Sequence, residues 1–398
     1  MTRVYSKALD QEIEVDRIIG VIKGVQPGPN VLMTGGIHGN EPSGVFALHK
    51  VLQYLKSNNI NVKGNFYAIS GNLWALEKGE RYKEQDLNRL WIKDNLNSFA
   101  SKQPTSEDES QQKEIYTLFK EIMASEVGPF YFMDLHTTSS ETIPFLTVND
   151  SLLNRQFTQQ YPVPIILGIE EYLDGPLLSY INELGFVAFG YEGGQHDDLT
   201  SIENHVAFIM LSLVFAGSIE KHDIDYQHYY DFLAKNTVDS RDIYEVIYQH
   251  LIDENQYFKM RPGFFNFQLI RQNSILADNG QSEIRAPYSG RIFMPLYQDK
   301  GTDGFFIIRT IPDKFMRLSA FLRKIRADRI LPILPGVKWI DEQRETLLVD
   351  RRIARFMAKQ LFHLLGYRSK RKDKSHYIMK NREAVARTEE YKEAIWLN

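Results

Sequence analysis

The stretch VLMTGGIHGNEPSG, residues 31–44, decides the fold class of this 398-residue chain. Its first four residues form an apolar run of the length expected for a buried strand, and the glycines that follow let the backbone turn sharply. His38 and Glu41 then lie three residues apart in the glycine-rich loop. We expect a buried strand that ends in a loop carrying an imidazole and a carboxylate.

Apolar runs of this kind alternate with helix-like stretches from Asp16 to about Ser218. The strand-like runs are Ile18–Ile22, Val31–Thr34, Asn65–Ser70, Phe130–Leu135, Phe145–Val148, Ile165–Leu167 and Phe186–Tyr191. The helix-like stretches are Ser43–Lys56, Glu109–Ala124, Ser151–Gln159 and Ile202–Ala216. Strands that are apolar throughout and alternate with helices indicate an α/β fold, with a mixed, mostly parallel sheet covered by helices on both faces. Ligands of such sheets bind where the strands end.

The pattern changes twice further along the chain. After Met260, glycines separate short β-like runs, which indicates a small β-domain. We therefore predict four parts: an α/β domain (1–222), an aromatic-rich helical connector (223–259), a small β-domain (260–312) and a basic helical C-terminal extension (313–398). The polar segment Ala100–Gln112 reads as an exposed insertion.

Composition excludes several classes of protein and of site. With 43% hydrophobic residues the chain can build a sizeable core, and it is not a disordered chain. The absence of cysteine excludes disulfides, thiolate metal sites, iron–sulfur clusters and a thiol nucleophile, so a metal must bind to His, Asp or Glu. Neither a signal-peptide core nor a run of eighteen apolar residues is present, and we expect a cytoplasmic protein with no membrane partner.

The net charge of −4 is unevenly distributed. Residues 314–398 hold 21 Lys and Arg against 10 Asp and Glu, a net +11, which leaves −15 for the rest of the chain. A basic end can bind an anionic partner such as nucleic acid, or it can pack on its own acidic body. The second interpretation is favoured by apolar residues that share one helical face, Ile353, Phe356, Met357, Leu361, Leu364 and Leu365, with Arg351, Arg352, Arg355 and Lys359 largely off it. Only Arg368–Lys374 then remains as a free basic cluster.

A second imidazole follows another predicted strand. FYFMDLHTTSS, residues 130–140, carries His136 at the strand end. Alone, each of His38, Glu41 and His136 fits a turn or strand-end role. Together they form a three-ligand set for one zinc ion with a position left open for water, although two His and one carboxylate also suit iron. Asp134, two residues earlier, can orient an imidazole or be a buried core acid.

Two further segments carry polar side chains suited to catalysis. In RYKEQDLNR, residues 81–89, an arginine fork can bind a carboxylate beside Asn88, and a second arginine can face a developing oxyanion. Read alone, the segment is also compatible with a charged surface. Glu192 follows the Phe186–Tyr191 strand, where a carboxylate can act as general base and then as general acid, or be an ordinary loop acid.

HGNE, RYKEQDLNR, DLHTTSS and the Glu192 loop, in this order and on this strand pattern, resemble the zinc carboxypeptidase superfamily. Within it, the chain is most similar to the succinylglutamate desuccinylase/aspartoacylase family, over about residues 15–216 and in the β-domain after residue 260. The resemblance implies a zinc-carboxypeptidase-like fold and one zinc ion bound by His38, Glu41 and His136. It further implies that Arg81 polarises the scissile carbonyl, that Glu192 activates water, and that the substrate carboxylate is held by Asn88 and Arg89.

The implied function is hydrolysis of the amide bond of a small N-acyl amino acid that bears a carboxylate. We do not expect a nucleic-acid partner, and a homo-oligomer is compatible with the sequence. Two alternatives stay open: a zinc peptidase that acts on peptides or cell-wall fragments, and a non-enzymatic anion or nucleic-acid binder that uses the basic tail. Salt-dependent nucleic-acid binding would favour the last.

The chain departs from the family pattern at one position. Aspartoacylases carry an arginine ten residues before the catalytic glutamate, to recognise an acidic side chain, whereas this chain has Asn182 there. The loop Gly168–Pro176 is acidic instead. We therefore do not expect N-acetylaspartate as substrate, and succinylglutamate is in doubt for the same reason. The acidic loop either favours a neutral or cationic substrate group or is simply solvated.

Overall fold

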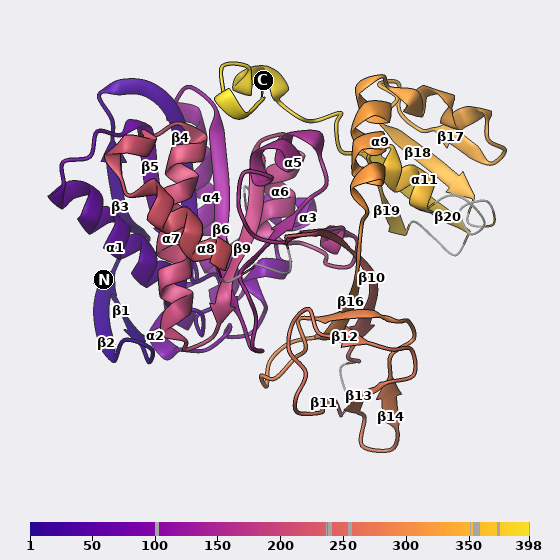
Figure 1. Ribbon diagram of the computed structural model, residues 1–398, viewed down its shortest axis with the longest axis horizontal. Helices are drawn as coiled ribbons and strands as arrows, with labels where there is room; N and C mark the ends of the chain where they lie inside the picture. Colours follow the sequence, from indigo (N-terminus) through magenta and orange to yellow (C-terminus); the bar gives the residue numbers. More distant parts are fainter. Residues whose placement is uncertain are drawn as a thin grey trace.

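The computed structural model describes residues 1–99, 103–235, 237, 241–253, 257–350, 352, 359–371 and 375–397 (Figure 1). Across these residues runs a sheet of eleven strands. Their order is β12 (Leu269–Ile270), β15 (Gly290–Phe293), β16 (Asp303–Thr310), β10 (Ile243–Leu251), β8 (Ile165–Leu167), β7 (Phe145–Val148), β9 (Val187–Gln195), β6 (Phe130–Thr138), β4 (Gln26–Gly35), β5 (Lys63–Ser70) and β3 (Ile18–Lys23).

The centre of this sheet is parallel. β5, β4, β6 and β9 pair in parallel, as do β7, β8 and β10, and antiparallel pairs join β9 to β7 and β10 to β16. Every residue of β6 is buried, because helices cover both faces of the sheet. The predicted α/β class with a mixed, mostly parallel sheet is confirmed, and each predicted strand of the α/β region has a counterpart.

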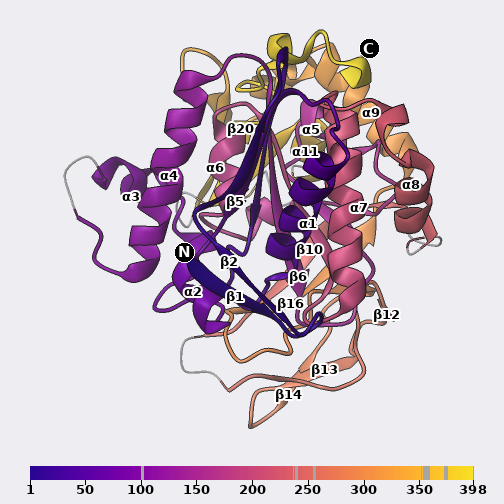
Figure 2. The same cartoon turned by 90° about the vertical axis from the view of Figure 1, so that its left-hand side faces the viewer.

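Alternate side chains of the central strands point to opposite faces of the sheet and pack into two separate hydrophobic cores. On β4, Val31 and Met33 pack with α1 (Ser43–Ser57) and α7 (Leu199–Ala216), whereas Leu32 packs with α4 (Glu107–Ser125) and α6 (Leu177–Glu183). Figure 2 shows α4 on one side of the sheet and α1 and α7 on the other. α7 is long and apolar enough to cross a membrane by length and composition, but 72% of it is buried inside the protein, where it serves as a core helix.

The region expected to be a helical connector contains a strand. α8 (Tyr226–Lys235) is helical, but the expectation of helix was wrong for Ile243–Leu251, which forms β10. Tyr244 and Val246 are buried in alternation, the period of a strand, and β10 bridges β8 and β16. The main sheet therefore continues into the β-rich region, where β11 (Lys259–Met260), β13 (Ile275–Asp278) and β14 (Glu283–Arg285) form a second sheet. The division into four domains stays a prediction.

The C-terminal extension is not purely helical, contrary to the expectation. Besides α9 (Asp313–Lys324) and α11 (Lys359–Leu364) it holds a four-stranded antiparallel sheet, in the order β17 (Val337–Trp339), β18 (Thr346–Asp350), β20 (His376–Asn381) and β19 (Tyr367–Arg371). The strands are short and half-buried, as in β18, where buried and partly exposed residues alternate. Leu365, predicted on the apolar face of the amphipathic segment, is buried, and Arg352, predicted largely off that face, is exposed. Outside the described residues lie Arg351, Ile353, Arg355, Phe356 and Met357, as well as 372–374 of the predicted basic cluster.

The extension packs on the acidic body. Tyr391, near the C-terminus, is fully buried and accepts a hydrogen bond from the backbone N–H of Val187, and the indole N–H of Trp396 donates to Tyr131 Oη at 3.1 Å. Arg368, expected in a free basic cluster, is instead buried against Asp150 and acidic neighbours, because the extension covers those carboxylates.

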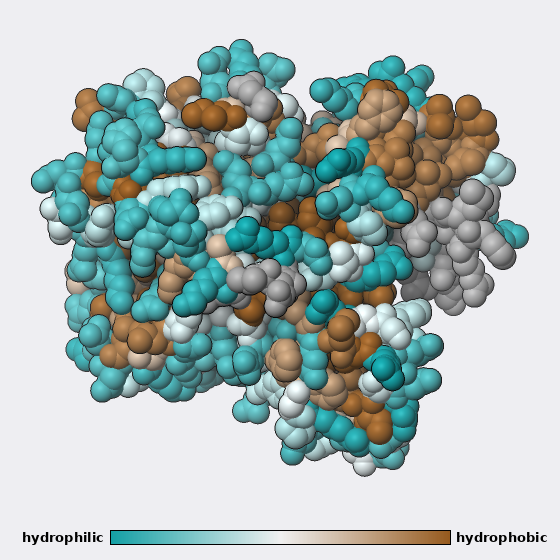
Figure 3. All heavy atoms as spheres, in the orientation of Figure 1, coloured by the Kyte–Doolittle hydropathy of each residue, from teal (hydrophilic) through white to brown (hydrophobic). Residues whose placement is uncertain are grey.

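Apolar side chains gather on the surface of the extension, at the upper right of Figure 3. The exposed residues of α9 and of the 3-10 turn Ala327–Ile333 include Phe315, Leu318, Phe321, Ile330 and Ile333. Much of the remaining surface in this view is hydrophilic.

Candidate active site

The candidate site lies where β4, β6 and β9 end. Since the three strands are parallel, their carboxyl ends share one edge of the sheet, and the register sets His136 of β6 beside Glu192 of β9. His38 and Glu41 follow β4 in the loop predicted to carry them. Gly39 holds this loop close to α2 (Leu73–Lys78), because a Cβ there would lie 2.0 Å from the backbone of Ala75.

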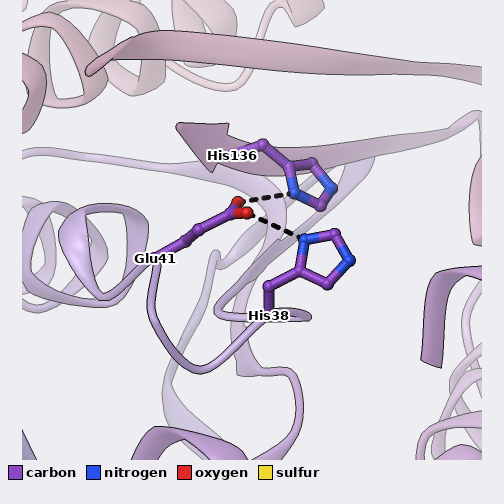
Figure 4. A group of neighbouring side chains, drawn as sticks. All are labelled: His38, Glu41 and His136. Carbon is purple, nitrogen blue, oxygen red and sulfur yellow. Dashed lines mark hydrogen bonds and ion pairs between the residues drawn. The ribbon is translucent and has the colours of Figure 1, made fainter. Parts of the chain in front are cut away.

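Two imidazoles face one carboxylate at this edge (Figure 4). His38 Nδ1 lies 2.9 Å from Glu41 Oε1, and His136 Nδ1 lies 2.9 Å from Glu41 Oε2. All three residues are buried, and one ligand atom from each falls within 4.8 Å of the others. The donor set suits a divalent cation in chemistry and spacing, because imidazole nitrogen and carboxylate oxygen are the zinc ligands that remain without cysteine.

Each imidazole is backed by a second carboxylate on its other nitrogen. His136 Nε2 lies 2.8 Å from Asp134 Oδ2, and Asp134 accepts a hydrogen bond from Thr34 Oγ1. His38 Nε2 lies 3.0 Å from Asp86 Oδ1. Carboxylates in this position fix the ring orientation of metal-binding histidines and raise their basicity. Asp134 thus has the orienting position that the sequence suggested. The corresponding role of Asp86 beside His38 was not predicted.

Interactions within this group of residues favour an ionised Glu41 and a protonated His136. Burial opposes ionisation of Glu41, yet the imidazoles of His38 and His136 hold its pKa well below the usual value. Burial likewise acts against protonation of His136, but Asp134 and Glu41 raise its pKa well above that of a free imidazole. A bound cation would take the place of such protons, since metal ligands must lose them.

Arg81 lies against this cluster. Its Nη1 donates to Glu41 Oε1 and its Nη2 to Asp86 Oδ2, both at 3.2 Å. Burial would lower the pKa of Arg81, but the charges of Asp86 and Glu41 raise it, so the guanidinium stays charged. Asp86 therefore joins Arg81 to His38 and links the 81–89 loop to the His38–Glu41–His136 group.

Asn88 and Arg89 reach the same cavity from the end of this loop. Asn88 Oδ1 accepts a hydrogen bond from the backbone N–H of Leu177 at 2.9 Å, which fixes the amide. Arg89 Nη2 donates to Asp303 Oδ2 at 2.9 Å, an ion pair to the first residue of β16. The arginine expected to hold a substrate carboxylate is thus already paired with a carboxylate of the β-rich region.

A buried acid of α4 holds the loop in shape. Asp108 is fully buried and accepts hydrogen bonds from Asn72 Nδ2 and from the backbone N–H groups of residues 83, 84 and 85 at 2.8–3.3 Å. The expectation that Ala100–Gln112 is an exposed insertion was wrong from Glu107 onward, where α4 begins. Residues 100–102 lie outside the described part of the chain. Ser106 and Glu109, in the spacing of a capping box, were the overlooked signal of a helix start.

Glu192 is buried beside the His38–Glu41–His136 group. Within the described residues its Oε2 has no hydrogen-bond partner, and burial raises its pKa to about 8. The next residue, Gly193, packs so closely against buried His205 that a Cβ would lie 2.4 Å from the ring. A carboxylic acid with an elevated pKa beside a cavity is typical of a proton-transfer group.

The seven predicted site residues line one cavity of about 150 Å³: His38, Glu41, Arg81, Asn88, Arg89, His136 and Glu192. The β-rich region supplies another wall, with Met294, Leu296, Gln298, Gly301, Asp303 and Phe306. A cavity of about this volume holds a molecule of the size of benzene. A cavity of this size therefore suits a small substrate group better than a folded polypeptide.

The position that departs from the family pattern lies outside the cavity. Asn182 Nδ2 donates to the backbone carbonyls of Leu178 and Ala188, and its Oδ1 accepts from Asn154. Glu170 of the acidic loop, by contrast, is 4% exposed and lines the cavity, so the interpretation of a solvated loop was wrong for this residue.

Comparison with known proteins agrees with the fold and the motifs. Residues 27–202 match the profile of the succinylglutamate desuccinylase/aspartoacylase catalytic domain. A 64-residue segment is 38% identical to succinylglutamate desuccinylase of Pseudomonas putida (strain GB-1), covering 16% of this chain and 19% of that protein. The match thus spans about a fifth of the length of this curated relative.

Two solved structures share the fold. A succinylglutamate desuccinylase/aspartoacylase from Rhodobacter sphaeroides superposes with a TM-score of 0.54 at 16% identity, over 73% of this chain and 88% of that one. The product-bound ectoine utilization protein EutE of Ruegeria pomeroyi gives a TM-score of 0.53 at 18% identity, with the same coverage. Residues 27–202 of this chain therefore resemble the catalytic domain of the succinylglutamate desuccinylase/aspartoacylase family.

Proposed function

We propose that the chain hydrolyses the amide bond of a small N-acyl amino acid and uses one zinc ion bound by His38, Glu41 and His136. One observation carries this proposal: three buried residues with ligand atoms within 4.8 Å of one another share a cavity with Glu192, a buried acid whose Oε2 has no hydrogen-bond partner among the described residues. Zinc at such a site would lower the pKa of water toward neutrality and polarise a carbonyl. The match of residues 27–202 to the catalytic domain of the succinylglutamate desuccinylase/aspartoacylase family supports an acyl-amino-acid deacylase.

Glu192 is the proton-transfer group in this proposal. As a carboxylate it takes a proton from the attacking water, and as an acid it gives the proton to the leaving amine. A pKa near 8 in the metal-free protein suits the second task, because the acid then holds its proton at neutral pH. A nearby cation would lower this pKa and so favour the first task. The pH–rate profile should therefore rise with pH on its acidic limb.

Three further residues position and stabilise the reacting groups. Arg81 is charged and adjacent to the metal-binding carboxylate, where it would stabilise the oxyanion that forms on attack. Asn88 and Arg89 would bind the substrate carboxylate and so reduce the entropic part of the barrier. All three line the same cavity as Glu192, which supports these roles.

The size of the cavity favours this proposal over a peptidase. The β-rich region closes one side of the site with residues 294–306, which leaves a cavity of about 150 Å³. The burial of Arg368 in ion pairs also speaks against a basic tail that binds nucleic acid.

Hydrolysis assays with N-acetyl and N-succinyl amino acids test the function directly. We expect release of the free amino acid by zinc-loaded enzyme, about 10³-fold loss after chelation, and recovery on adding zinc back, because the metal contributes several kcal/mol to catalysis. Peptides should be cleaved far more slowly. Rapid peptide cleavage without turnover of any N-acyl amino acid would support the peptidase alternative, and full activity of metal-free enzyme would contradict a role for the metal.

A further inference from the structure

Among the described residues, no unpaired lysine or arginine lines the cavity to bind an acidic substrate side chain. The cavity's only basic lining residues among those described, histidines aside, are Arg81 and Arg89, and each is paired with carboxylates. Four acids line the same cavity: Glu41, Glu170, Glu192 and Asp303. Even with a divalent cation on Glu41, a second substrate carboxylate would find no unpaired cation here.

Asp303 changes what Arg89 can bind. One oxygen of Asp303 accepts from Arg89 Nη2 at 2.9 Å, and the other accepts from Gln249 Nε2 at 2.6 Å. Both members of the pair are partly exposed, at 27% for Arg89 and 17% for Asp303, so a ligand can reach them. A single substrate carboxylate can share Arg89 with this acid, but a second one would be repelled.

Glu170, like Glu192, is a cavity-lining acid with one carboxylate oxygen that has no hydrogen-bond partner among the described residues. It is 4% exposed, and its Oε2 accepts no hydrogen bond from the described residues. Its Oε1 lies 3.4 Å from Arg368 Nε and 3.9 Å from Arg382 Nη2. Arg368 is at the same time shared with Asp150 and Glu171, so it does not satisfy the second oxygen of Glu170. A buried carboxylate oxygen without a donor is costly, and a ligand donor would remove that cost.

The walls near Glu170 suit an aliphatic chain that ends in an amine. Leu173 and Leu178 give apolar surface for methylene groups. Asn149, which donates to Ser179 Oγ at 3.2 Å, adds a neutral polar surface that does not repel an ammonium group. An ammonium group needs hydrogen-bond acceptors of this kind, carboxylate and neutral oxygens, around an apolar stem.

We propose that the amine half of the substrate is a diamino acid, whose side-chain ammonium group binds Glu170 while its α-carboxylate binds Asn88 and Arg89. This inference rests on the proposed function, since it assumes that an N-acyl amino acid enters the cavity. Glu170 is then the residue that determines specificity, and Asp303 weakens the attraction of Arg89 for acidic side chains. The acidic residues that line the cavity distinguish this site from one that binds aspartate or glutamate.

Three substrates of nearly equal shape test the inference: Nα-acyl ornithine, norleucine and glutamate, each as the acetyl and the succinyl derivative. Zinc-loaded enzyme should show kcat/KM about 10-fold to 100-fold higher for ornithine than for its neutral isostere norleucine, the size of a charge-assisted hydrogen bond. Glutamate should be the poorest of the three. Calorimetry with the free amino acids should give the same order of affinity.

Matched variants locate the effect. Glu170→Gln should bring the ornithine-to-norleucine ratio toward one, whereas Glu171→Gln, a neighbouring acid whose buried side chain does not line the cavity, should leave the ratio within about 2-fold. Asp303→Asn should improve glutamate relative to norleucine. A preference of the wild type for norleucine or glutamate would overturn the inference alone, even if the variants fail to fold. Hydrolysis of none of the six compounds would contradict the proposed function, and the inference with it.

Discussion

Two buried clusters of charge in this protein are each built around a nearly fully buried carboxylate, but they have different roles. Glu41 lies between the imidazoles of His38 and His136, whereas Asp150 lies between the guanidiniums of Arg155, Arg323 and Arg368. Imidazoles can lose their protons and bind a cation in their place, but guanidiniums remain charged. The first cluster also lines the cavity, and Asp150 does not.

The chemistry of the partners and access to the cavity, rather than burial, therefore distinguish a reactive cluster from a structural one. The arginines around Asp150 come from α5 (Leu152–Thr158), α9 and β19, so the cluster joins the α/β domain to the C-terminal extension. Most of the basic residues that it uses belong to the extension, which explains part of the charge asymmetry of the chain. The two clusters should therefore respond differently to mutation, one in stability and the other in chemistry.

The largest effect should come from removing the central acid of the structural cluster. Asp150→Asn should lower the free energy of unfolding by about 3–5 kcal/mol in denaturant titrations, because it leaves three buried guanidiniums without their common partner. The zinc content of the folded protein should not change. Asp197→Asn, which removes an exposed ion pair with Lys7, should cost no more than about 1 kcal/mol.

The loss of stability caused by Asp150→Asn should also depend on pH. Burial alone would raise the pKa of Asp150, but Arg155, Arg323 and Arg368 hold it well below the usual value. Its contribution to stability is thus complete above about pH 4, where the unfolded side chain ionises, and is lost as pH falls through the folded pKa. A difference between wild type and variant that grows on acidification would contradict this account.

The second-largest effect should be on the rate of catalysis and not on stability. Glu192→Gln should lower kcat by about 10²-fold or more, because the amide cannot transfer the proton. Zinc content and melting temperature should stay close to wild type, since at neutral pH the buried acid of the metal-free protein is already largely protonated. Glu84→Gln, in the exposed part of the 81–89 loop, is the control for altered charge. Normal turnover by the Glu192→Gln enzyme would remove this glutamate from the mechanism.

The smallest effect should come from an acid that belongs to neither cluster. Asp108→Asn keeps the shape of the side chain but weakens the hydrogen bonds that hold residues 83–85, so Arg81 and Asn88 should be less well positioned. We expect about a 10-fold loss in kcat/KM with zinc still bound. Steady-state kinetics and metal analysis separate this outcome from loss of the fold, which would remove both.

Much of the site could be predicted because parallel strands end at one edge of a sheet. The order of HGNE, DLH and Glu192 on an alternating strand pattern was enough to bring His38, His136 and Glu192 into one cavity. The backing acid Asp134 could be suggested because it lies two residues from His136 on the same strand.

The rest depends on contacts between distant segments, which spacing does not reveal. Asp86 meets His38 across 48 positions, and Arg89 meets Asp303 across 214. The same holds for Arg368. Its segment is basic in sequence, but the buried acids that it contacts, Asp150 and Glu170, lie far away along the chain. Residues 243–251 were misread because their aromatic and aliphatic residues fit either a helix or a strand, and only pairing with β8 and β16 decides between them.

The proposed function depends most on one feature, the binding of one catalytic zinc ion by His38, Glu41 and His136. The most direct measurement is the metal content of purified wild type and of His136→Ala, by elemental analysis, alongside their circular dichroism. The account predicts about one zinc ion per wild-type chain and almost none in a folded His136→Ala protein. A wild-type chain without zinc or a related divalent metal, or a variant that keeps its full metal content, would contradict it.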